Sequence, residues 1–341
     1  MRAIVYTENG PSDVLELVDR PVPEPGPGEV RVRVAVSAVN PTDWKSRAGS
    51  GAGSGDSQER TPNQDGAGTV DAIGPDVTAV SPGDRVWLFL AAHERPTGTA
   101  QESTVVPVER VVPLPDDVSF EVGASLGVPA MTAHRALTVH EGGPARLAPG
   151  ALAGRTVLVA GGAGAVGHAA IQLAHWAGAT VVTTVSSEAK ATLARAAGAD
   201  VTVNYREEDA AARIRAVAPD GVDLVVEVSP ARNAELNAAV LANHGSVAVY
   251  ATDGGASVTL DVRHHFALNV RYQFLLLYTV GPAALAAAAE DITAALAEGA
   301  LPVGEEAGLP ITRFPLKRTA EAHDAVEQGV VGKVLIEVEE R

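Results

Sequence analysis

The sequence predicts an α/β protein of two domains, one of which contains a parallel sheet covered by helices on both faces. The chain has 341 residues, which is long for a single simple core. Residues 1–120 show short alternating runs such as 30–37, separated by proline and glycine clusters such as 21–28. From about residue 122, apolar strands alternate with helical stretches, which is typical of a doubly wound parallel sheet.

The elements expected after residue 120 follow from hydrophobic periodicity. We expect a helix over 129–137, a strand from Thr156 up to a glycine cluster, and a helix up to Gly178. Further expected elements are strands over 179–185, 201–203, 222–228 and 246–251, a helix over 282–299, and a strand over 332–338 that returns to the first domain. Residues 45–61 are rich in glycine and serine and predict a loop, either disordered or a substrate lid.

The most informative motif is Gly162-x-Gly164-x-x-Gly167, which follows an apolar strand and opens a helix. Glycines at this spacing allow a tight turn, close approach of the backbone to a pyrophosphate, and close packing of helix on strand. Ala165 and Val166 begin the helix, whose free N–H groups attract an anion. The motif therefore predicts a dinucleotide site.

The end of the next strand indicates which dinucleotide binds. An NAD site usually has an acidic residue there, about twenty residues beyond the glycines. This chain has Ser186 and Ser187 instead, with Lys190 shortly after. A hydroxyl and an ammonium can bind a 2′-phosphate, so we expect NADPH. The alternative is that these residues only cap and solvate a helix.

Composition narrows the class of partner. The net charge of −16 argues against a nucleic-acid partner, and the absence of cysteine excludes disulfides, thiolate catalysis and cysteine-bound zinc. The apolar stretch 270–289 is interrupted by Arg271, Gln273 and Pro282, so we expect no membrane span. No signal-peptide pattern opens the sequence, and we expect the protein in the cytoplasm.

Six blocks in order resemble one known family: 40–49, 65–87, 129–137, the glycine turn, 199–207 and 332–338. Over its whole length the chain resembles the medium-chain dehydrogenase/reductase superfamily, in particular its zinc-free quinone oxidoreductase (zeta-crystallin-like) branch. The resemblance implies a Rossmann-type nucleotide domain and a mostly β GroES-like catalytic domain. We assign residues 122–262 to the former, and residues 1–121 and 263–341 to the latter.

The resemblance also bears on metal binding. Zinc-dependent members have a cysteine where this chain has Asn40, and a His-Glu pair where it has Gln64 and Asp65. Without histidine, Asp43 and Asp65 would make only an oxygen-type site, so we expect no metal. The other metal clue is a set of scattered histidines, which surface exposure explains more simply: His93, His264 and His265.

Without a metal to stabilise an alkoxide, the easier substrates are those that spread incoming negative charge themselves. The resemblance implies an NADPH-dependent reductase of a small electrophile, either a quinone or an α,β-unsaturated carbonyl compound. One alternative is an enoyl reductase acting on acyl thioesters, for which Arg60, Arg95 and Arg263 could supply phosphate contacts. Another is a low-turnover NADPH-binding protein with a structural or redox-sensing role.

Several site residues are carried over from the resemblance. It implies that Asn40 and Thr132 contact the nicotinamide end, and that Tyr205 joins Ser186 and Lys190 around the 2′-phosphate. Tyr205 could instead be a tyrosine at the edge of the core. Lys333 is assigned to the cofactor only through a Gly-Lys-Val pattern.

Other candidates come from position along the expected strands. Tyr250 ends a strand at the edge where such sheets bind ligands, and Phe274 and Leu276 could close the same pocket or be buried strand residues. Substrate-pocket candidates are Asn40, Asp43, Trp44 and Tyr250, and the sequence identifies no proton donor or catalytic residue. We also expect a homodimer through an apolar edge strand, over 246–251 or 271–278.

Overall fold

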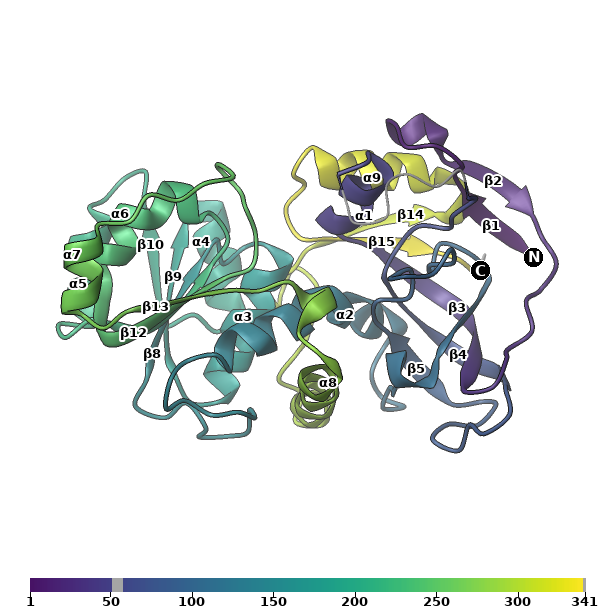
Figure 1. Cartoon of the computed structure of the whole chain (residues 1–341), viewed down its shortest axis with the longest axis horizontal. Coiled ribbons are helices and arrows are strands. Elements are labelled where there is room, and N and C mark those ends of the chain that lie inside the picture. The colour runs from purple at the N-terminus through teal and green to yellow at the C-terminus, as the bar shows by residue number, and fades with distance from the viewer. Residues whose placement is uncertain (51–57, 340–341) are drawn as a thin grey trace. The chain divides into compact units, whose positions relative to one another are not determined.

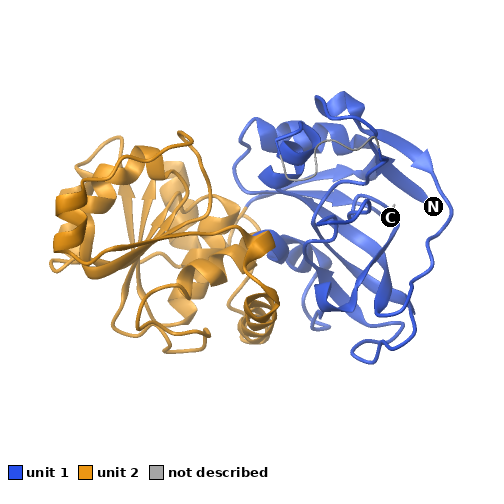
Figure 2. Cartoon of the chain, in the orientation of Figure 1, with its two compact units in different colours: residues 1–128, 310–341 blue, residues 129–309 orange. Residues whose placement is uncertain are grey.

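A computed structural model describes residues 1–50 and 58–339, and the chain forms two compact units (Figures 1 and 2). Unit 1 comprises residues 1–128 and 310–341, and unit 2 comprises residues 129–309. The boundary expected at 262/263 is corrected by this division. Residues 263–309 belong to unit 2, because strand β13 (Arg271–Phe274) within them pairs with β12 (Leu241–Val249).

Unit 2 is built on a six-stranded sheet in the order β10-β9-β8-β11-β12-β13, with every pair parallel. Its remaining strands are β8 (Thr156–Ala160), β9 (Thr180–Val185), β10 (Val201–Asn204) and β11 (Val222–Glu227). Counted from the first strand of the unit, the order is 3-2-1-4-5-6, which is that of the Rossmann fold. The predicted fold class is confirmed.

The helices between these parallel strands connect them, as crossover geometry requires (Figure 1). They are α3 (Ala165–Trp176), α4 (Glu188–Ala196), α5 (Ala210–Val217), α6 (Pro230–Val240) and α7 (Val262–Ala267). Helix α8 (Pro282–Ala297) follows the last strand, β13, after a 3₁₀ turn over Leu277–Thr279. Pro282 stands in the first turn of α8, as expected, where its missing N–H costs no helical hydrogen bond.

The core of unit 2 explains why its strands are so rich in valine. Val157, Val182, Val225 and Val247 are all fully buried, and they lie on four neighbouring strands. A strand covered on both faces has no polar face, so its sequence reads as a continuous apolar run. Burying one such side chain stabilises the fold by about 1.5–3 kcal/mol.

Unit 1 contains a seven-stranded sheet whose main path is β14-β15-β3-β4-β5-β7, with β6 paired to β3, and a separate β1-β2 pair. The strands are β1 (Arg2–Val5), β2 (Glu16–Asp19), β3 (Glu29–Val39), β4 (Asp65–Ile73), β5 (Arg85–Leu88), β6 (Ser103–Pro107), β7 (Val111–Pro113), β14 (Ile311–Pro315) and β15 (Lys333–Glu337). Strand β15 pairs antiparallel with β3, as expected of a strand that returns to this unit.

Unit 1 also contains helix α1 (Pro41–Arg47), which the all-β expectation for residues 1–120 omitted, and 3₁₀ turns over Ser12–Val14 and Val108–Arg110. Its C-terminal segment adds helix α9 (Thr319–Glu327) and a 3₁₀ turn over Leu316–Arg318. The loop expected over 45–61 therefore begins later, because residues 45–47 are helical. Residues 51–57 of that segment lie outside the described residues, and so does the choice between disorder and a lid.

Helix α2 (Phe120–Leu137) starts earlier than the predicted helix over 129–137 and is broken in the middle. Gly127 has φ −13° and ψ −113°, and Pro129 follows within the helix. Proline lacks an N–H and clashes with the preceding turn, which breaks the helical hydrogen-bond pattern. The break frees the amide of Val128 to bind a side chain in unit 1.

Two further expectations concern the edges of the nucleotide sheet and the apolar stretch. Strand β12 lies between β11 and β13, so the segment 246–251 is not an edge strand, and β13 is the edge on that side. Sequence alone could not place β13 outside β12. Among the described residues, no helix is both long enough and apolar enough to cross a membrane.

Candidate functional site

The predicted glycine turn lies between β8 and α3, and its geometry explains two of its three glycines by packing. A Cβ atom on Gly162 would lie 2.2 Å from Thr183 Oγ1, and one on Gly167 would lie 2.4 Å from Gly161 O. Gly161 just before them has φ +73°, a left-handed conformation that favours glycine. These residues let the turn pack closely on β9 and let α3 approach the strand.

Gly164 differs from Gly162 and Gly167 because no atom of the described residues crowds the position that its Cβ would take. The nearest atom to a Cβ built there is Gly161 O, at the ordinary contact distance of 3.6 Å. Gly164 is the N-cap of α3, and the next amides, of Ala165 and Val166, have no partner one turn back in the helix. Open space beside free N–H groups at a helix N-terminus fits a pyrophosphate.

The residues expected around a 2′-phosphate lie at the ends of two adjacent strands. Val185 at the end of β9 pairs with Asn204 at the end of β10, so Ser186 and Tyr205 follow neighbouring strands at the same edge. The side chain of Tyr205 is 51% exposed. It is therefore not a core-edge residue and is accessible to a ligand.

The start of α4 is arranged to favour an anion. Its N-cap is Ser187, whose Oγ accepts the amide of Lys190 at 3.4 Å, so Ser186 is not the cap. The acid in the first turn of α4, Glu188, pairs with Arg195. The ammonium of Lys190 makes no ion pair among the described residues, which leaves its charge for a ligand.

The candidates for the nicotinamide end lie at the carboxyl edge of β11, β12 and β13. Tyr250 directly follows β12, and its amide donates to Glu227 O at 3.1 Å. Burial, together with the charges of Glu227 and Asp253, raises the pKa of Tyr250, so its phenol stays protonated. Phe274 and Leu276 are 61% and 56% exposed. Their interpretation as buried strand residues is therefore wrong, and they remain available to a ligand.

Thr132 lies in α2, beyond the break, and is 8% exposed. It belongs to unit 2, whereas its predicted companion Asn40 belongs to unit 1.

In unit 1, Asn40, Asp65 and Lys333 form a buried polar cluster at the end of β3. Lys333 Nζ donates to Asn40 Oδ1 at 2.5 Å, and Asn40 Nδ2 donates to Asp65 Oδ2 at 2.7 Å. Both carboxylate oxygens of Asp65 also accept the Val128 amide at 2.9 Å, which is the amide freed by the break in α2. Asn40, Asp65 and Lys333 are each at most 2% exposed.

Asp43, the substrate-pocket candidate on α1, is also part of this buried region. Its two carboxylate oxygens accept the amides of Asn40 at 2.7 Å and Gln64 at 3.1 Å. Burial and the nearby charge of Asp65 raise the pKa of Asp43 to about 7. Burial likewise raises the pKa of Asp65 to about 6, opposed chiefly by Lys333. Asp43 therefore holds the start of α1 to the chain before β4.

The other pocket candidate on α1, Trp44, is partly exposed. The ammonium of Lys45 lies 5.7 Å from the centroid of its ring, within the range of a cation–π contact. Trp44 is thus the aromatic side chain that α1 offers next to Asp43.

Two of the three histidines considered as metal ligands form hydrogen bonds with other protein groups. His264 Nε2 lies 2.9 Å from Ala238 O, and His265 Nε2 lies 3.2 Å from the Tyr272 hydroxyl. His93 belongs to unit 1 and these two to unit 2. Within residues 1–50 and 58–339, no three His, Cys, Asp or Glu side chains gather as a metal site would require.

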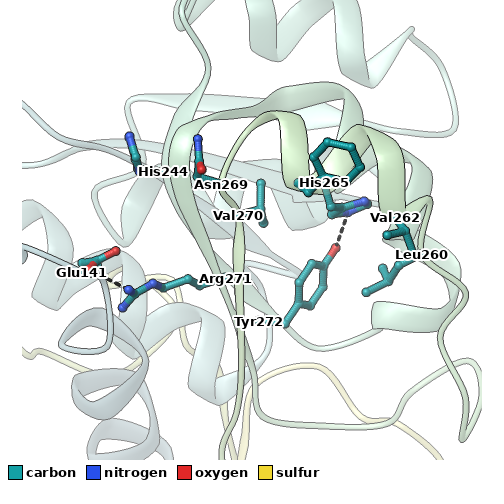
Figure 3. Close-up of a pocket in the computed structure, with 10 residues that line it drawn as sticks. Glu141, His244, Leu260, Val262, His265, Asn269, Val270, Arg271 and Tyr272 are labelled. Carbon is teal, nitrogen blue, oxygen red and sulfur yellow. Dashed lines mark hydrogen bonds and ion pairs between the residues drawn. The ribbon is translucent and has the colours of Figure 1, made fainter.

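A hollow of about 650 Å³ lies beside α7 and β13 (Figure 3). It is lined by Tyr272, by His265 and by the Glu141–Arg271 ion pair, whose atoms are 2.6 Å apart. These residues lie at the amino end of β13, away from the carboxyl edge where sheets of this type bind nucleotides. The hollow is therefore separate from the candidate site.

Comparison with known proteins agrees with this architecture. Residues 26–116 match the alcohol dehydrogenase GroES-like domain, and residues 165–294 match the zinc-binding dehydrogenase domain. The fold and the two domain matches define a medium-chain dehydrogenase/reductase, and the chain belongs to that superfamily.

Particular relatives narrow the class. Quinone oxidoreductase from Rattus norvegicus is 31% identical over 283 residues, covering 81% of this chain and 79% of the rat protein. A mycobacterial protein, Rv1454c, solved in complex with NADPH, is 32% identical, with a TM-score of 0.82 over 99% of this chain and 100% of its own. A solved NAD-dependent alcohol dehydrogenase is 30% identical, with the same TM-score over 99% of this chain and 100% of its own.

Two features of the site were not identified from the sequence: the buried Glu227 and the contact between Lys333 and Asn40. Glu227 is fully buried at the end of β11, where its carboxylate accepts Ser229 N at 2.6 Å, Asn233 Nδ2 at 2.9 Å and Asn237 Nδ2 at 2.7 Å. An acid directly after the apolar run 224–226 was the signal available in the sequence. The contact between Lys333 and Asn40 had no such signal, because it depends on strand pairing.

Proposed function

We propose that this chain is a zinc-independent, NADPH-dependent reductase that transfers hydride to a quinone or an α,β-unsaturated carbonyl compound. The observation on which this rests most is the ammonium of Lys333, 2.5 Å from Asn40 Oδ1 and next to Asp65. Asn40, Gln64 and Asp65 stand where zinc-dependent relatives have metal ligands. Here the ammonium of Lys333 binds Asn40 and acts electrostatically on Asp65, and a divalent cation beside it would be repelled.

The cofactor is NADPH, which supplies the hydride when it is bound. The space beside Gly164 and the free amides of α3 fit its pyrophosphate. Among relatives that differ in cofactor, the residues at the end of β9 favour the phosphorylated one. Ser186, Lys190 and the exposed Tyr205 supply a hydroxyl, a positive charge and a phenol. Among the described residues Lys190 has no ion-pair partner, while Glu188 pairs with Arg195.

The substrate class follows from what the chain offers to a developing negative charge. The buried acids Asp43 and Asp65 accept the backbone amides of Asn40 and Val128, which supports a site that works without a Lewis acid. Quinones and enones can be reduced without a Lewis acid, because hydride addition leaves a negative charge that is delocalised between oxygen and the conjugated carbons. We assign Asn40, Thr132, Tyr250, Phe274 and Leu276 to the nicotinamide end.

Substrate contacts are assigned to unit 1. We assign Trp44 to the substrate as an aromatic surface and Asp43 to holding α1 in place, because both of its oxygens bind amides. The structure offers no side chain that we assign as proton donor, and water can supply the proton after hydride transfer.

A substrate panel tests this function. NADPH oxidation is followed with a benzoquinone, an alkenal and crotonyl-CoA, and NADP⁺ reduction is followed with a simple alcohol. Each assay is repeated with NADH or NAD⁺ in place of the phosphorylated cofactor. We expect turnover with the quinone or the alkenal, with NADPH preferred. Turnover confined to crotonyl-CoA would identify a thioester reductase, and turnover of the alcohol would contradict the proposal. Tight NADPH binding with no turnover would identify a low-activity binding protein.

We further propose that the protein is a cytoplasmic homodimer that pairs through β13. This strand is an edge of the nucleotide sheet and ends in the exposed Phe274. Exposed apolar edge strands need cover in soluble proteins.

A further inference from the structure

The carboxamide of Asn40 is fixed from both of its ends. An ammonium can only donate, so Lys333 Nζ at 2.5 Å identifies the atom facing it as Oδ1. An ionised carboxylate can only accept, so Asp65 Oδ2 at 2.7 Å identifies the atom facing it as Nδ2. The two contacts therefore select one of the two orientations of the amide.

This orientation leaves one N–H of Asn40 for a ligand. The Nδ2 atom has two hydrogens, and within residues 1–50 and 58–339 only the bond to Asp65 uses one. The backbone of Asn40 is fixed as well, because its N–H donates to Asp43 Oδ2 at 2.7 Å. A reversed amide would turn its oxygen toward Asp65, where two acceptors would face each other.

Strand pairing delivers Lys333 to this position. Val334 on β15 pairs with Val39 on β3, which places Lys333 next to Asn40 at the end of the ladder. Lys333 is 2% exposed, and its Nζ also donates to Val39 O at 3.3 Å. The ammonium is therefore enclosed by protein and can influence a bound reactant only through Asn40.

We propose that Lys333 is a positioning residue, which holds the Asn40 carboxamide so that its free N–H meets the reactants during hydride transfer. This inference rests on the proposed function, in which Asn40 contacts the nicotinamide end. It replaces the direct cofactor contact that the sequence pattern assigned to Lys333. Lys333 fixes the Asn40 carboxamide by one buried positive charge, and this does not require a metal ion.

A double-mutant cycle separates positioning from mere structural support. Lys333→Met removes the ammonium while keeping an unbranched side chain, and it is made alone and in an Asn40→Ala background. We expect Lys333→Met and Asn40→Ala each to lower kcat for NADPH-dependent quinone reduction about tenfold. The double variant should be no slower than Asn40→Ala alone. The melting temperature should fall with Lys333→Met in both backgrounds, because the buried acids lose their counter-charge either way.

Two further variants serve as a substitute for Lys333→Met and as a surface control. Lys333→Met combined with Asp43→Asn keeps the net charge of the buried cluster, and it takes the place of Lys333→Met if that variant does not fold, with Asp43→Asn alone as its reference. Lys317→Met makes the same change at an exposed site of unit 1 and should leave kcat and the melting temperature unchanged.

The outcomes distinguish the two proposals. If the wild-type protein does not reduce quinones or enones with NADPH, the proposed function fails. If the wild type is active but Lys333→Met slows the Asn40→Ala enzyme by a further tenfold, only the positioning role fails. It also fails if Lys333→Met keeps the wild-type kcat.

Discussion

In the proposed site, Lys190 is the residue that we expect to affect cofactor preference most directly. Its ammonium has no acidic partner among the described residues, and it stands on the first turn of α4, behind Ser186. A charge-assisted hydrogen bond to a 2′-phosphate contributes about 1.5–3 kcal/mol. NADH lacks that phosphate, so it should not sense the lysine.

We therefore expect Lys190→Ala to raise the Michaelis constant for NADPH about tenfold and to change that for NADH little. Steady-state kinetics with both cofactors measures this. Arg195→Ala is a useful comparison, because it frees Glu188 and should also weaken NADPH binding. Equal losses for NADPH and NADH in Lys190→Ala would contradict the assignment.

His323 makes a second prediction at the residue scale, concerning stability. It is fully buried on α9, and its Nε2 lies 2.9 Å from Asn63 Oδ1. Burial and the charge of Arg47 lower the pKa of His323 from 6.5 to about 3. In the unfolded chain the histidine takes up a proton below its ordinary pKa, while in the folded chain it stays neutral. His323 therefore lowers the free energy of unfolding as the pH falls below 6.5.

Replacing it should flatten the acid limb of the stability curve. His323→Gln keeps a donor for Asn63 but cannot titrate, so its free energy of unfolding should fall less steeply between pH 6 and pH 4, by up to about 1.4 kcal/mol per pH unit. Urea unfolding across this range measures it. His175→Gln, at an exposed histidine, should keep the wild-type slope. Identical slopes for His323→Gln and wild type would refute the argument.

In the turn between β8 and α3, one glycine is expected to matter for ligand binding and another for stability. Gly164→Ala places a methyl group in open space and requires no unusual backbone, since its φ is −86°. We expect this variant to keep the wild-type melting temperature and to bind NADPH at least about tenfold more weakly. Gly167→Ala places its methyl group against Gly161 O and should lose about 1–3 kcal/mol of stability.

Calorimetric titration with NADPH and thermal unfolding together check this pair. If Gly164→Ala binds NADPH as the wild type does, the space beside Gly164 is not the pyrophosphate site. If Gly167→Ala is as stable as the wild type, the close packing of α3 on the strand is misjudged.

The elements also show what the sequence can and cannot predict. The glycine turn, Ser186 and Lys190 follow from local spacing, because the chemistry of one βα unit is contained in about thirty residues. The placement of β13 depends on which sheet accepts it, and this is a long-range choice. The domain boundary at 262/263 therefore differed from the structure. The role of Lys333 was hidden for the same reason, because β15 meets β3 across almost the whole chain.

At the scale of the whole molecule, the proposed dimer depends on the edge strand β13. Phe274→Lys places a charge on that exposed edge and should shift the protein toward monomer in sedimentation at micromolar concentration. Val262→Lys changes an equally apolar and more exposed residue on α7, off the strand, and should shift it less. A wild-type protein that sediments as a monomer would contradict the dimer itself.

In the proposed function the protein transfers hydride from NADPH with an amide and a lysine in the place where zinc-dependent relatives have metal ligands. The most direct test is quinone or enone reduction by protein that has been stripped of metal with a chelator and checked by elemental analysis. The account predicts full turnover without zinc and no gain when zinc is added back. Activity that disappears on stripping and returns in proportion to bound zinc would contradict it.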